Sequence, residues 1–454
     1  MKFGIKNLGP IKDANLEIGN LTIVCGKNNV GKTYYTYALY SFLTTIKDIF
    51  IIDFEENLFD TCIKTGECVF NFEKVKSHFL FYLNKYNKFF AKIVPFYLAL
   101  NPQKTTATID ISSELEECEY NIFKNRIVSE RRQATEKCYF DIEKADNSFD
   151  IRVRIINMGE ALPERSILRP LFDNICSNVL NEIFPDAFSL TGERTGLSIF
   201  ATDMARFSEK SPEVKPLPKN EEPVSIEDFE KKQLTIFPLP ILKELEFFQQ
   251  FKLVQRKVSF IAKNHSHILH YMNQISGGHY SYEEQLGIQF VPEQSSNPLS
   301  LYKSSSSVRS LVEFYFYLKH CAKEKQILMI DEPELNLHPQ NQRFIARLLA
   351  KLVNAGVRVF ITTHSDYIIR EFNTLIALKQ DKPHLLKIKN EEGYSDDELL
   401  DASGIRAYIA RRNPDGVTFN PTTVTQDGGI DIPTLDEVID KMNQIQDAII
   451  WGTE

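Results

Sequence analysis

Two stretches of sequence decide the fold, GKNNVGKT at residues 26–33 and ILMIDEPELNLHP at residues 327–339. The first matches the G-x-x-x-x-G-K-[ST] pattern of a phosphate-binding loop, whose glycines allow backbone N–H groups to converge on an anion. The second is an apolar run that ends in two acidic residues. Together the two stretches predict one composite site for ATP and Mg²⁺.

The residues of both stretches have expected roles in that site. Lys32 would reach the terminal phosphates, and Thr33 would supply a magnesium ligand. Asp331 would bind the same magnesium, and Glu332 would lie beside the attacking water. The residues expected to bind the nucleotide through the first stretch are Gly26, Lys27, Asn28, Asn29, Val30, Gly31, Lys32 and Thr33.

The sequence around the first stretch agrees with a phosphate-binding loop. Leu21–Cys25 (LTIVC) is a short apolar run that predicts a buried strand, and Tyr34–Leu43 continues as a helix. The phosphates would then lie at a helix N-terminus, where free N–H groups and the helix dipole favour negative charge.

Two further strands are predicted around the second stretch. Gln326–Ile330 is an apolar run of strand length, typical of a central strand buried on both faces, and Val357–Thr362 is another. The latter leads into Thr363, His364 and Ser365. Because polar residues at the carboxyl ends of parallel strands lie at the ligand crevice of an α/β sheet, His364 is a third candidate catalytic residue beside Lys32 and Glu332, in contact with the terminal phosphate. The alternative is a surface or capping histidine.

The order of these motifs resembles the ABC-type ATPase heads, in particular the branch of SMC, RecF and OLD-type proteins. The resemblance rests on the phosphate loop, on the Asp331-Glu332-Pro333 run with its LNLHP loop, and on TTHSD at residues 362–366. The opening residues 2–28 and GERTGL at Gly192–Leu197 are also similar to segments of that branch. The resemblance implies an α/β fold: an ABC-type ATPase head with a mixed sheet and P-loop core, plus an inserted α/β-helical lobe.

The serine run Ser304–Leu311 (SSSSVRSL) stands where ABC heads carry their signature sequence, although the usual LSGGQ is absent. The resemblance implies that Ser305 and Ser306 contact the γ-phosphate bound by a second copy of the chain. The alternative is a helix N-cap preceded by a flexible entry. His338 occupies a position that is aspartate in many ABC heads, which puts the communication between two sites in doubt.

The motifs and the segments between them suggest a discontinuous domain organisation. The expected ATPase core comprises residues 1–45, 185–207 and 276–454. Residues 46–184 are expected to form an inserted region with a helix at Lys74–Leu100 and four strands, Thr108–Ser112, Cys118–Phe123, Lys137–Glu143 and Phe149–Ile155. Residues 208–275 are expected to hold a proline-rich linker and a helical lobe of one or two helices from Pro238 to Ile275. Pro433–Ile450 predicts a final amphipathic helix.

Composition bounds the functional class. The chain has 454 residues, 43% of them hydrophobic, and no run of eighteen apolar residues, so a cytoplasmic protein that does not enter the membrane is expected. Its net charge of −8 argues against a generally basic nucleic-acid surface, so contact with nucleic acid is expected to be indirect. The acids after His364 contain no DxD pair of the Toprim kind, and no intrinsic nuclease is expected.

An ATPase head without a coiled-coil arm or a nuclease domain resembles the ATPase subunits of antiphage defence systems, such as Septu (PtuA), PARIS (AriA) and retron-associated ATPases. The resemblance implies a sensor and scaffold that forms a homo-oligomer through its heads and controls a separately encoded HNH or Toprim nuclease. The alternative function is a RecF-like DNA-repair ATPase that clamps duplex DNA directly. A third is a nucleotide-regulated scaffold with slow turnover.

Overall fold

The computed structural model describes residues 1–101, 104–111, 130–135, 138–144, 148, 150–157, 184–207, 237–295 and 297–451. The expected strand Cys118–Phe123 and the expected proline-rich linker Ser208–Ser225 lie outside these residues.

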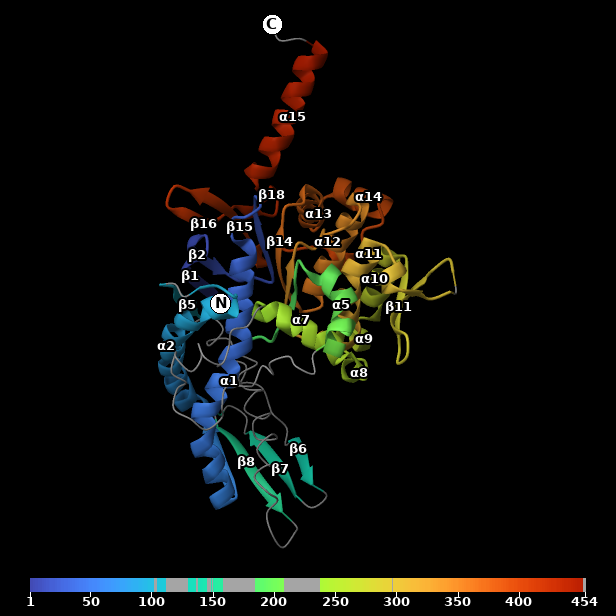
Figure 1. The fold of residues 1–454 in the computed structure, drawn as a ribbon. Helices are drawn as coiled ribbons and strands as arrows, with labels where there is room; N and C mark the ends of the chain where they lie inside the picture. The colour runs from blue at the N-terminus through green and yellow to red at the C-terminus, as the bar shows by residue number, and fades with distance from the viewer. Residues whose placement is uncertain are drawn as a thin grey trace.

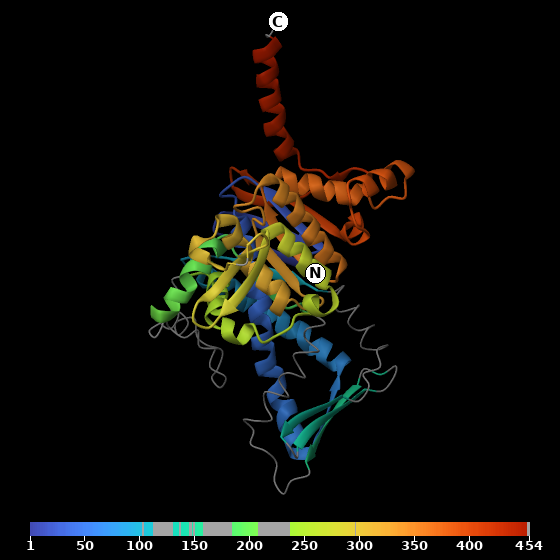
Figure 2. The same cartoon turned by 90° about the vertical axis from the view of Figure 1, so that its right-hand side faces the viewer.

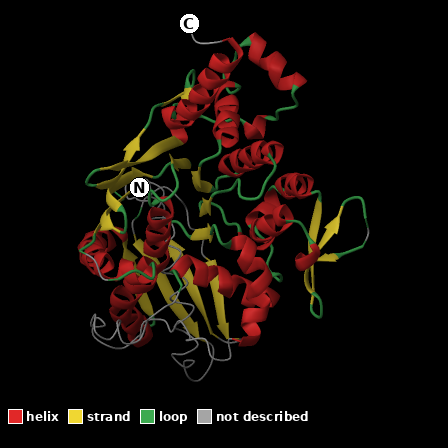
Figure 3. Ribbon diagram, turned by 45° about the horizontal axis from the view of Figure 1, so that its top comes forward, coloured by secondary structure: helices red, strands yellow, loops and turns green. Residues whose placement is uncertain are grey.

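A mixed sheet of nine strands forms the centre of the molecule (Figures 1 and 3). Its order is β5-β1-β2-β16-β15-β3-β14-β13-β9. The five strands from β15 to β9 are parallel to one another, and β16 is parallel to β2. Antiparallel pairs join β1 to β2, β1 to β5 and β15 to β16. The expected α/β class with a mixed sheet is therefore confirmed. The strands are β1 (Lys2–Leu8), β2 (Ile11–Glu17), β3 (Leu21–Gly26), β5 (Thr106–Asp110), β9 (Ala187–Leu190), β13 (Ile327–Asp331), β14 (Arg358–Thr363), β15 (Ile405–Asn413) and β16 (Gly416–Pro421).

The strands that carry the motifs are central because their side chains are apolar on both faces. Every residue of β13 is buried, and so is nearly all of β3 and β14. The helix α1 (Lys32–Thr65) packs against these strands, and α12 (Pro339–Asn354) and α13 (Asp366–Ala377) pack against each other. The three strands predicted from the apolar runs are confirmed.

Helix α1 extends well beyond the nucleotide motif. It runs through residue 45, where the first core segment was expected to end, and continues to Thr65. Its far end meets a four-stranded antiparallel sheet, in the order β4-β8-β7-β6, that lies away from the central sheet (Figure 1). The strands are β4 (Glu67–Asn71), β6 (Glu130–Thr135), β7 (Cys138–Lys144) and β8 (Asp150–Asn157).

Part of the expected insertion belongs to the central sheet. Helix α2 (Phe72–Tyr97) returns along α1 and leads to β5, which pairs with β1. The predicted helix Lys74–Leu100 and the predicted strand Thr108–Ser112 are thus confirmed as elements. The domain boundaries themselves remain a proposal.

A helical group covers the β9 side of the sheet (Figure 1). The tract Pro238–Ile275 forms four helices where one or two were expected, because Gln250, Gln255–Ser259 and His265 interrupt it. The four helices of the tract are α7 (Leu239–Gln249), α8 (Phe251–Val254), α9 (Phe260–Asn264) and α10 (Ser266–Ser276). The helical group also contains α5 (Arg194–Phe207) and α11 (Ser306–Phe316). A small sheet of β10 (Gly278–Glu283), β11 (Gly287–Pro292) and β12 (Leu299–Ser300) lies at one side of the molecule (Figure 3).

The carboxyl-terminal part completes the central sheet and then leaves it. The hairpin β15–β16 turns at Asn413–Gly416, as the Asn-Pro-Asp-Gly turn predicts. Helix α14 (Pro383–Glu391) follows α13. The short antiparallel pair of β17 (Val424–Thr425) and β18 (Gly429–Ile430) follows β16. The predicted last helix is confirmed as α15 (Pro433–Trp451), and it projects away from the rest of the molecule (Figures 1 and 2). Within the described part of the chain, no helix combines the length and the apolar character that crossing a membrane requires.

Candidate functional site

The phosphate loop connects the end of β3 to the start of α1, as its motif predicts. Gly31 has φ 81° and precedes the first helical residue, and a Cβ there would lie 2.9 Å from Ile11 Cγ1. Gly26 has φ 151°, and its Cβ would lie 2.6 Å from the carbonyl oxygen of Ala410. Both positions therefore require glycine. Lys27, Asn28 and Asn29 are exposed at the tip of the loop, and Val30 is buried.

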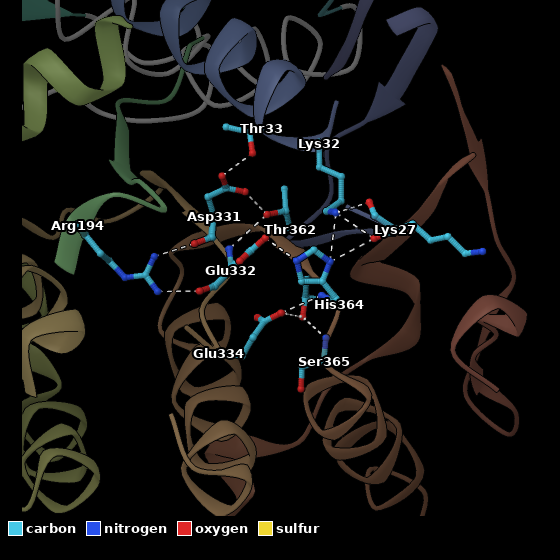
Figure 4. A network of polar contacts seen from close by, with 12 residues as sticks. Lys27, Lys32, Thr33, Arg194, Asp331, Glu332, Glu334, Thr362, His364 and Ser365 are labelled. Carbon is cyan, nitrogen blue, oxygen red and sulfur yellow. Dashed lines mark hydrogen bonds and ion pairs between the residues drawn. The ribbon is translucent and has the colours of Figure 1, made fainter. Parts of the chain in front are cut away.

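Lys32 points from the first turn of α1 back over the loop (Figure 4). Its Nζ donates to the carbonyl oxygens of Gly26 at 2.9 Å and Lys27 at 3.0 Å, and it lies 3.3 Å from His364 Nδ1. Burial lowers the pKa of Lys32, against the neighbouring acids Glu332 and Asp331, which raise it. The ammonium group is thus held where the loop would surround a phosphate.

Thr33 and Asp331 meet although they come from opposite parts of the chain (Figure 4). Thr33 Oγ1 donates to Asp331 Oδ2 at 2.7 Å, and Thr362 Oγ1 donates to the other carboxylate oxygen. The parallel register of β13 and β14 places Asp331 opposite Thr362. Burial raises the pKa of Asp331, while the two hydroxyl donors oppose that shift. Thr362 belongs to the TTHSD run, but sequence analysis did not select it as a site residue.

Glu332 and His364 form an ion pair at the carboxyl ends of β13 and β14. Glu332 Oε1 lies 2.5 Å from His364 Nε2. The hydrogen bond from His364 lowers the pKa of Glu332, and the same bond raises the pKa of His364. The expected catalytic residues Lys32, Glu332 and His364 therefore form one cluster, in which His364 contacts both of the others.

The turn that carries His364 is fixed by an acid that sequence analysis did not select. Glu334 Oε1 accepts from the backbone N–H of His364 and from Thr363 Oγ1, both at 2.8 Å. Ser365 Oγ then accepts from Ile368 N at 3.2 Å and caps α13. Glu334 lies two residues after Glu332 in the same motif, so its position in the sequence was the only available signal.

Arg194 is a third residue that sequence analysis did not select, although its GERTGL segment had been recognised. It starts α5, is 3% exposed, and donates to the backbone carbonyls of both Asp331 and Glu332 at 2.7 Å (Figure 4). Burial lowers the pKa of Arg194, and the neighbouring acids Glu244 and Asp331 oppose this shift.

The serine run lies on the surface of the molecule, at the start of α11. Ser305 and Ser306 are exposed at the start of α11, and Ser305 Oγ accepts from Val308 N at 3.3 Å as the N-cap of that helix. His338 caps α12 in the same way, because its Nδ1 accepts from Gln340 N at 3.3 Å. Ser305 and His338 therefore each act as the N-cap of a helix in the same chain.

The residues present fit a nucleotide-bound magnesium ion. The hydroxyl of Thr33 and the carboxylate of Asp331 are the hard oxygen donors that Mg²⁺ prefers, and they already lie together. Among the residues that the structure describes, no group of three or more His, Cys, Asp or Glu side chains is arranged to hold a metal. A magnesium ion here would therefore depend on phosphate oxygens for part of its coordination.

Comparison with known proteins adds to this geometry. Three solved structures are similar to the chain at low scores. An SMC head bound to the C-winged helix domain of ScpA is 11% identical, covers 93% of this chain and 97% of its own, and has a TM-score of 0.36. The SMC head domain from Thermotoga maritima is 9% identical, with coverage of 93% and 98% and a TM-score of 0.31. An SMC head with an extended coiled coil bound to the C-terminal domain of ScpA, derived from Pyrococcus furiosus, is 10% identical, with coverage of 98% and 98% and a TM-score of 0.34.

No curated protein matches the sequence. A family model does match, and it is described as an AAA ATPase domain. The match extends over residues 1–369 and so includes the phosphate loop, Asp331, Glu332 and His364. Because this match spans well over half of the chain, the protein belongs to the AAA ATPase domain family.

Proposed function

We propose that this protein binds and hydrolyses ATP at the site described above and serves as the sensor and scaffold subunit of an antiphage defence complex. The ATPase part of the proposal rests on one observation. Lys32, Thr33, Asp331, Glu332 and His364 converge at the carboxyl ends of the central strands β3, β13 and β14. The part played in defence rests on the resemblance of the motif set to the ATPase subunits of such systems.

In the proposed reaction the chain's own residues position the nucleotide and stabilise charge. The phosphate loop and Lys32 would bind the triphosphate, and Thr33 and Asp331 would hold Mg²⁺. When bound, the magnesium ion would neutralise charge on the phosphate oxygens. Glu332 is kept ionised by His364, which suits it to orient and polarise the attacking water. His364 would contact the γ-phosphate, since it already lies beside Lys32.

The proposed oligomer follows from the position of the serine run. Ser305 and Ser306 are exposed at the N-terminus of α11, where N–H groups favour an anion. We propose that they contact the nucleotide held by a second copy of the chain, so that ATP closes two heads and hydrolysis reopens them. The closed oligomer would hold the separately encoded nuclease, and magnesium-dependent ATP turnover would control it.

Glu332→Gln tests the ATPase part. The variant keeps the shape of the side chain but loses the carboxylate that would polarise water. We expect ATP to stay bound, turnover to fall by about 100-fold or more, and the oligomer to persist in ATP. Glu392→Gln, at an exposed position after α14, is the matched control and should behave as the wild type. Equal turnover by Glu332→Gln and the wild type would remove Glu332 from the mechanism.

The proposed role in an antiphage defence complex needs a separate experiment. The chain should be expressed with the product of a neighbouring HNH or Toprim gene, and both copurification and nucleotide-dependent nuclease activity should be measured. Turnover should also be measured with and without duplex DNA at several salt concentrations. We expect a stable complex and no stimulation by DNA. A salt-dependent affinity for duplex, with turnover stimulated by it, would instead identify a DNA clamp of the RecF kind.

A further inference from the structure

Arg194 has a set of contacts that no sequence motif assigned. Its Nε donates to the carbonyl oxygen of Ser310 at 3.1 Å, and its Nη1 donates to those of Thr191 at 2.8 Å and Asp331 at 2.7 Å. Its Nη2 donates to the carbonyl oxygen of Glu332 at 2.7 Å. One guanidinium therefore joins the end of β9, the end of β13 and the helix α11 through backbone groups alone. Figure 4 shows it beside the two acids.

The backbone that Arg194 holds is in an unfavourable conformation. Glu332 has φ 52°, in the left-handed region that is unfavourable for a residue other than glycine. Such a conformation persists where the surroundings fix it, and here they act on both sides of the residue. Glu332 N donates to the carbonyl oxygen of Thr362 at 3.1 Å, while Arg194 binds the Glu332 carbonyl. The direction in which the Glu332 side chain leaves the backbone depends on both contacts.

The other end of the network reaches the helix that begins with the serine run. Ser310 lies in the second turn of α11, whose first turn carries Ser306. Its carbonyl is also one of the four that Arg194 binds, so a shift of α11 along its axis would move the guanidinium. Glu244 of α7 fixes a further point, because its Oε2 accepts from Thr191 N at 3.2 Å and Thr191 Oγ1 at 2.6 Å.

We propose that Arg194 is a positioning residue that couples the serine-bearing helix α11 to the carboxylate of Glu332. This inference rests on the proposed function, in which Glu332 polarises water and the serine run meets a second copy of the chain. Engagement of α11 would then change the rate of hydrolysis by orienting Glu332, with little effect on the affinity for ATP. Such a link would transmit a signal between two heads even though His338 replaces the aspartate expected after Glu332.

Lysine at position 194 separates charge from geometry. An ammonium keeps the positive charge among Glu244, Asp331 and Glu313, but it lacks the planar fork that reaches three segments at once. For Arg194→Lys we expect ATP affinity within about three-fold of the wild type and turnover lower by about 10- to 100-fold, because small misplacements of catalytic groups have effects of this size. Arg347→Lys is the matched control. Arg347 is also buried, but it pairs with Glu371 and should leave turnover unchanged.

A double-mutant cycle tests whether Arg194 acts through Glu332. In the Glu332→Gln background, Arg194→Lys should lower turnover by less than about two-fold further, since the carboxylate that it orients is gone. Should Arg194→Lys fail to fold, as judged by its thermal transition, Arg194→Gln offers a neutral side chain that can donate to one of the carbonyls, and the same losses are expected.

Three outcomes would overturn the inference. They are wild-type turnover in Arg194→Lys, a fall in ATP affinity that accounts for the whole loss of turnover, and full additivity with Glu332→Gln. These results differ from a failure of the proposed function. That failure would appear in the wild type, as an absence of ATP binding, or in Glu332→Gln, as undiminished turnover.

Discussion

Thr33 and Asp331 lie in distant parts of the sequence, and their contact is the smallest unit on which the site depends. The hydroxyl donates to the carboxylate at 2.7 Å, and Thr362 donates to the same group from the neighbouring strand. A buried carboxylate without such donors would be costly, and the pKa of Asp331 is already raised by burial. The hydrogen bond from Thr33 therefore stabilises the buried carboxylate of Asp331, and the two side chains offer two hard oxygens to a magnesium ion.

At the residue scale, we predict that Thr33→Val weakens ATP binding through the metal. Valine has nearly the shape of threonine but no oxygen ligand. In magnesium, ATP affinity should fall by about 10-fold or more, and chelation of the metal with EDTA should reduce wild-type affinity towards that of the variant. Isothermal titration in both buffers gives the comparison. Thr374→Val, a half-buried position on α13 outside the site, should bind ATP normally. A loss in Thr33→Val that persists unchanged in EDTA would argue against a metal ligand.

At the scale of elements, α7 and α11 meet through two buried acids. Glu313 is 1% exposed and Glu244 is 2% exposed. Burial, together with the neighbouring charge of Glu244, raises the pKa of Glu313 well above its usual range. Burial also raises the pKa of Glu244, to about 6, although hydrogen bonds from Glu313 and Thr191 oppose it. Glu313 therefore holds its proton to higher pH than an exposed glutamate does, which suits it to donate to Glu244.

This pair predicts a pH dependence of stability. An acid whose pKa is raised in the folded state binds its proton more tightly there, so the folded state loses stability as pH rises above the unfolded pKa of about 4.3. For Glu244 that loss is complete near pH 6, and for Glu313 it continues above. Glu313→Gln cannot ionise but can still donate to Glu244.

We therefore expect the melting temperature of Glu313→Gln to exceed that of the wild type by a few degrees at pH 7.5, and its slope above pH 6 to be flatter. Scanning calorimetry from pH 5 to 8 measures both. Glu371→Gln is the contrasting control, because Glu371 accepts from Arg343 and Arg347 at 2.6 Å and its loss should destabilise the protein. A lower melting temperature for Glu313→Gln at pH 7.5 would contradict the assignment of the proton.

The elements also show what the sequence could and could not predict. Strands β3, β13 and β14 were predictable because apolar runs of strand length lead directly into polar motifs. The position of β15 was not, since it pairs in parallel with β3 across almost the whole chain and no local pattern encodes such a partner. The contacts of Arg194 could not be predicted for the same reason. Its acceptors are backbone carbonyls, which carry no residue identity.

At the scale of the whole molecule, the last helix stands apart from the core. Along α15 the side chains of residues 441–450 are exposed except for Ala448, which is half-buried, and Ile449 is 77% exposed. The residues just before it are part of the folded body, since Ile430 and Ile432 are each 3% exposed. Folding of the core should therefore not depend on α15.

We predict that ending the chain after Ile432 changes the melting temperature of the core by no more than about 2 °C. Ile449→Ala should likewise have almost no effect. Ile430→Ala is the matched comparison, and its buried side chain should lower the melting temperature by about 3 °C or more, since such truncations cost about 2–5 kcal/mol. Differential scanning fluorimetry of the three variants is sufficient. A strongly destabilised truncation would show that α15 packs on the core.

The central claim is that the phosphate loop and the Asp331–Glu332 pair form one site for one nucleotide. An experimental structure of Glu332→Gln with ATP and magnesium tests it most directly. We predict a single triphosphate in the loop, with Lys32 and His364 at its terminal phosphate and with Thr33 and Asp331 at the metal. A triphosphate bound elsewhere, or a metal that lies away from Asp331, would contradict the account.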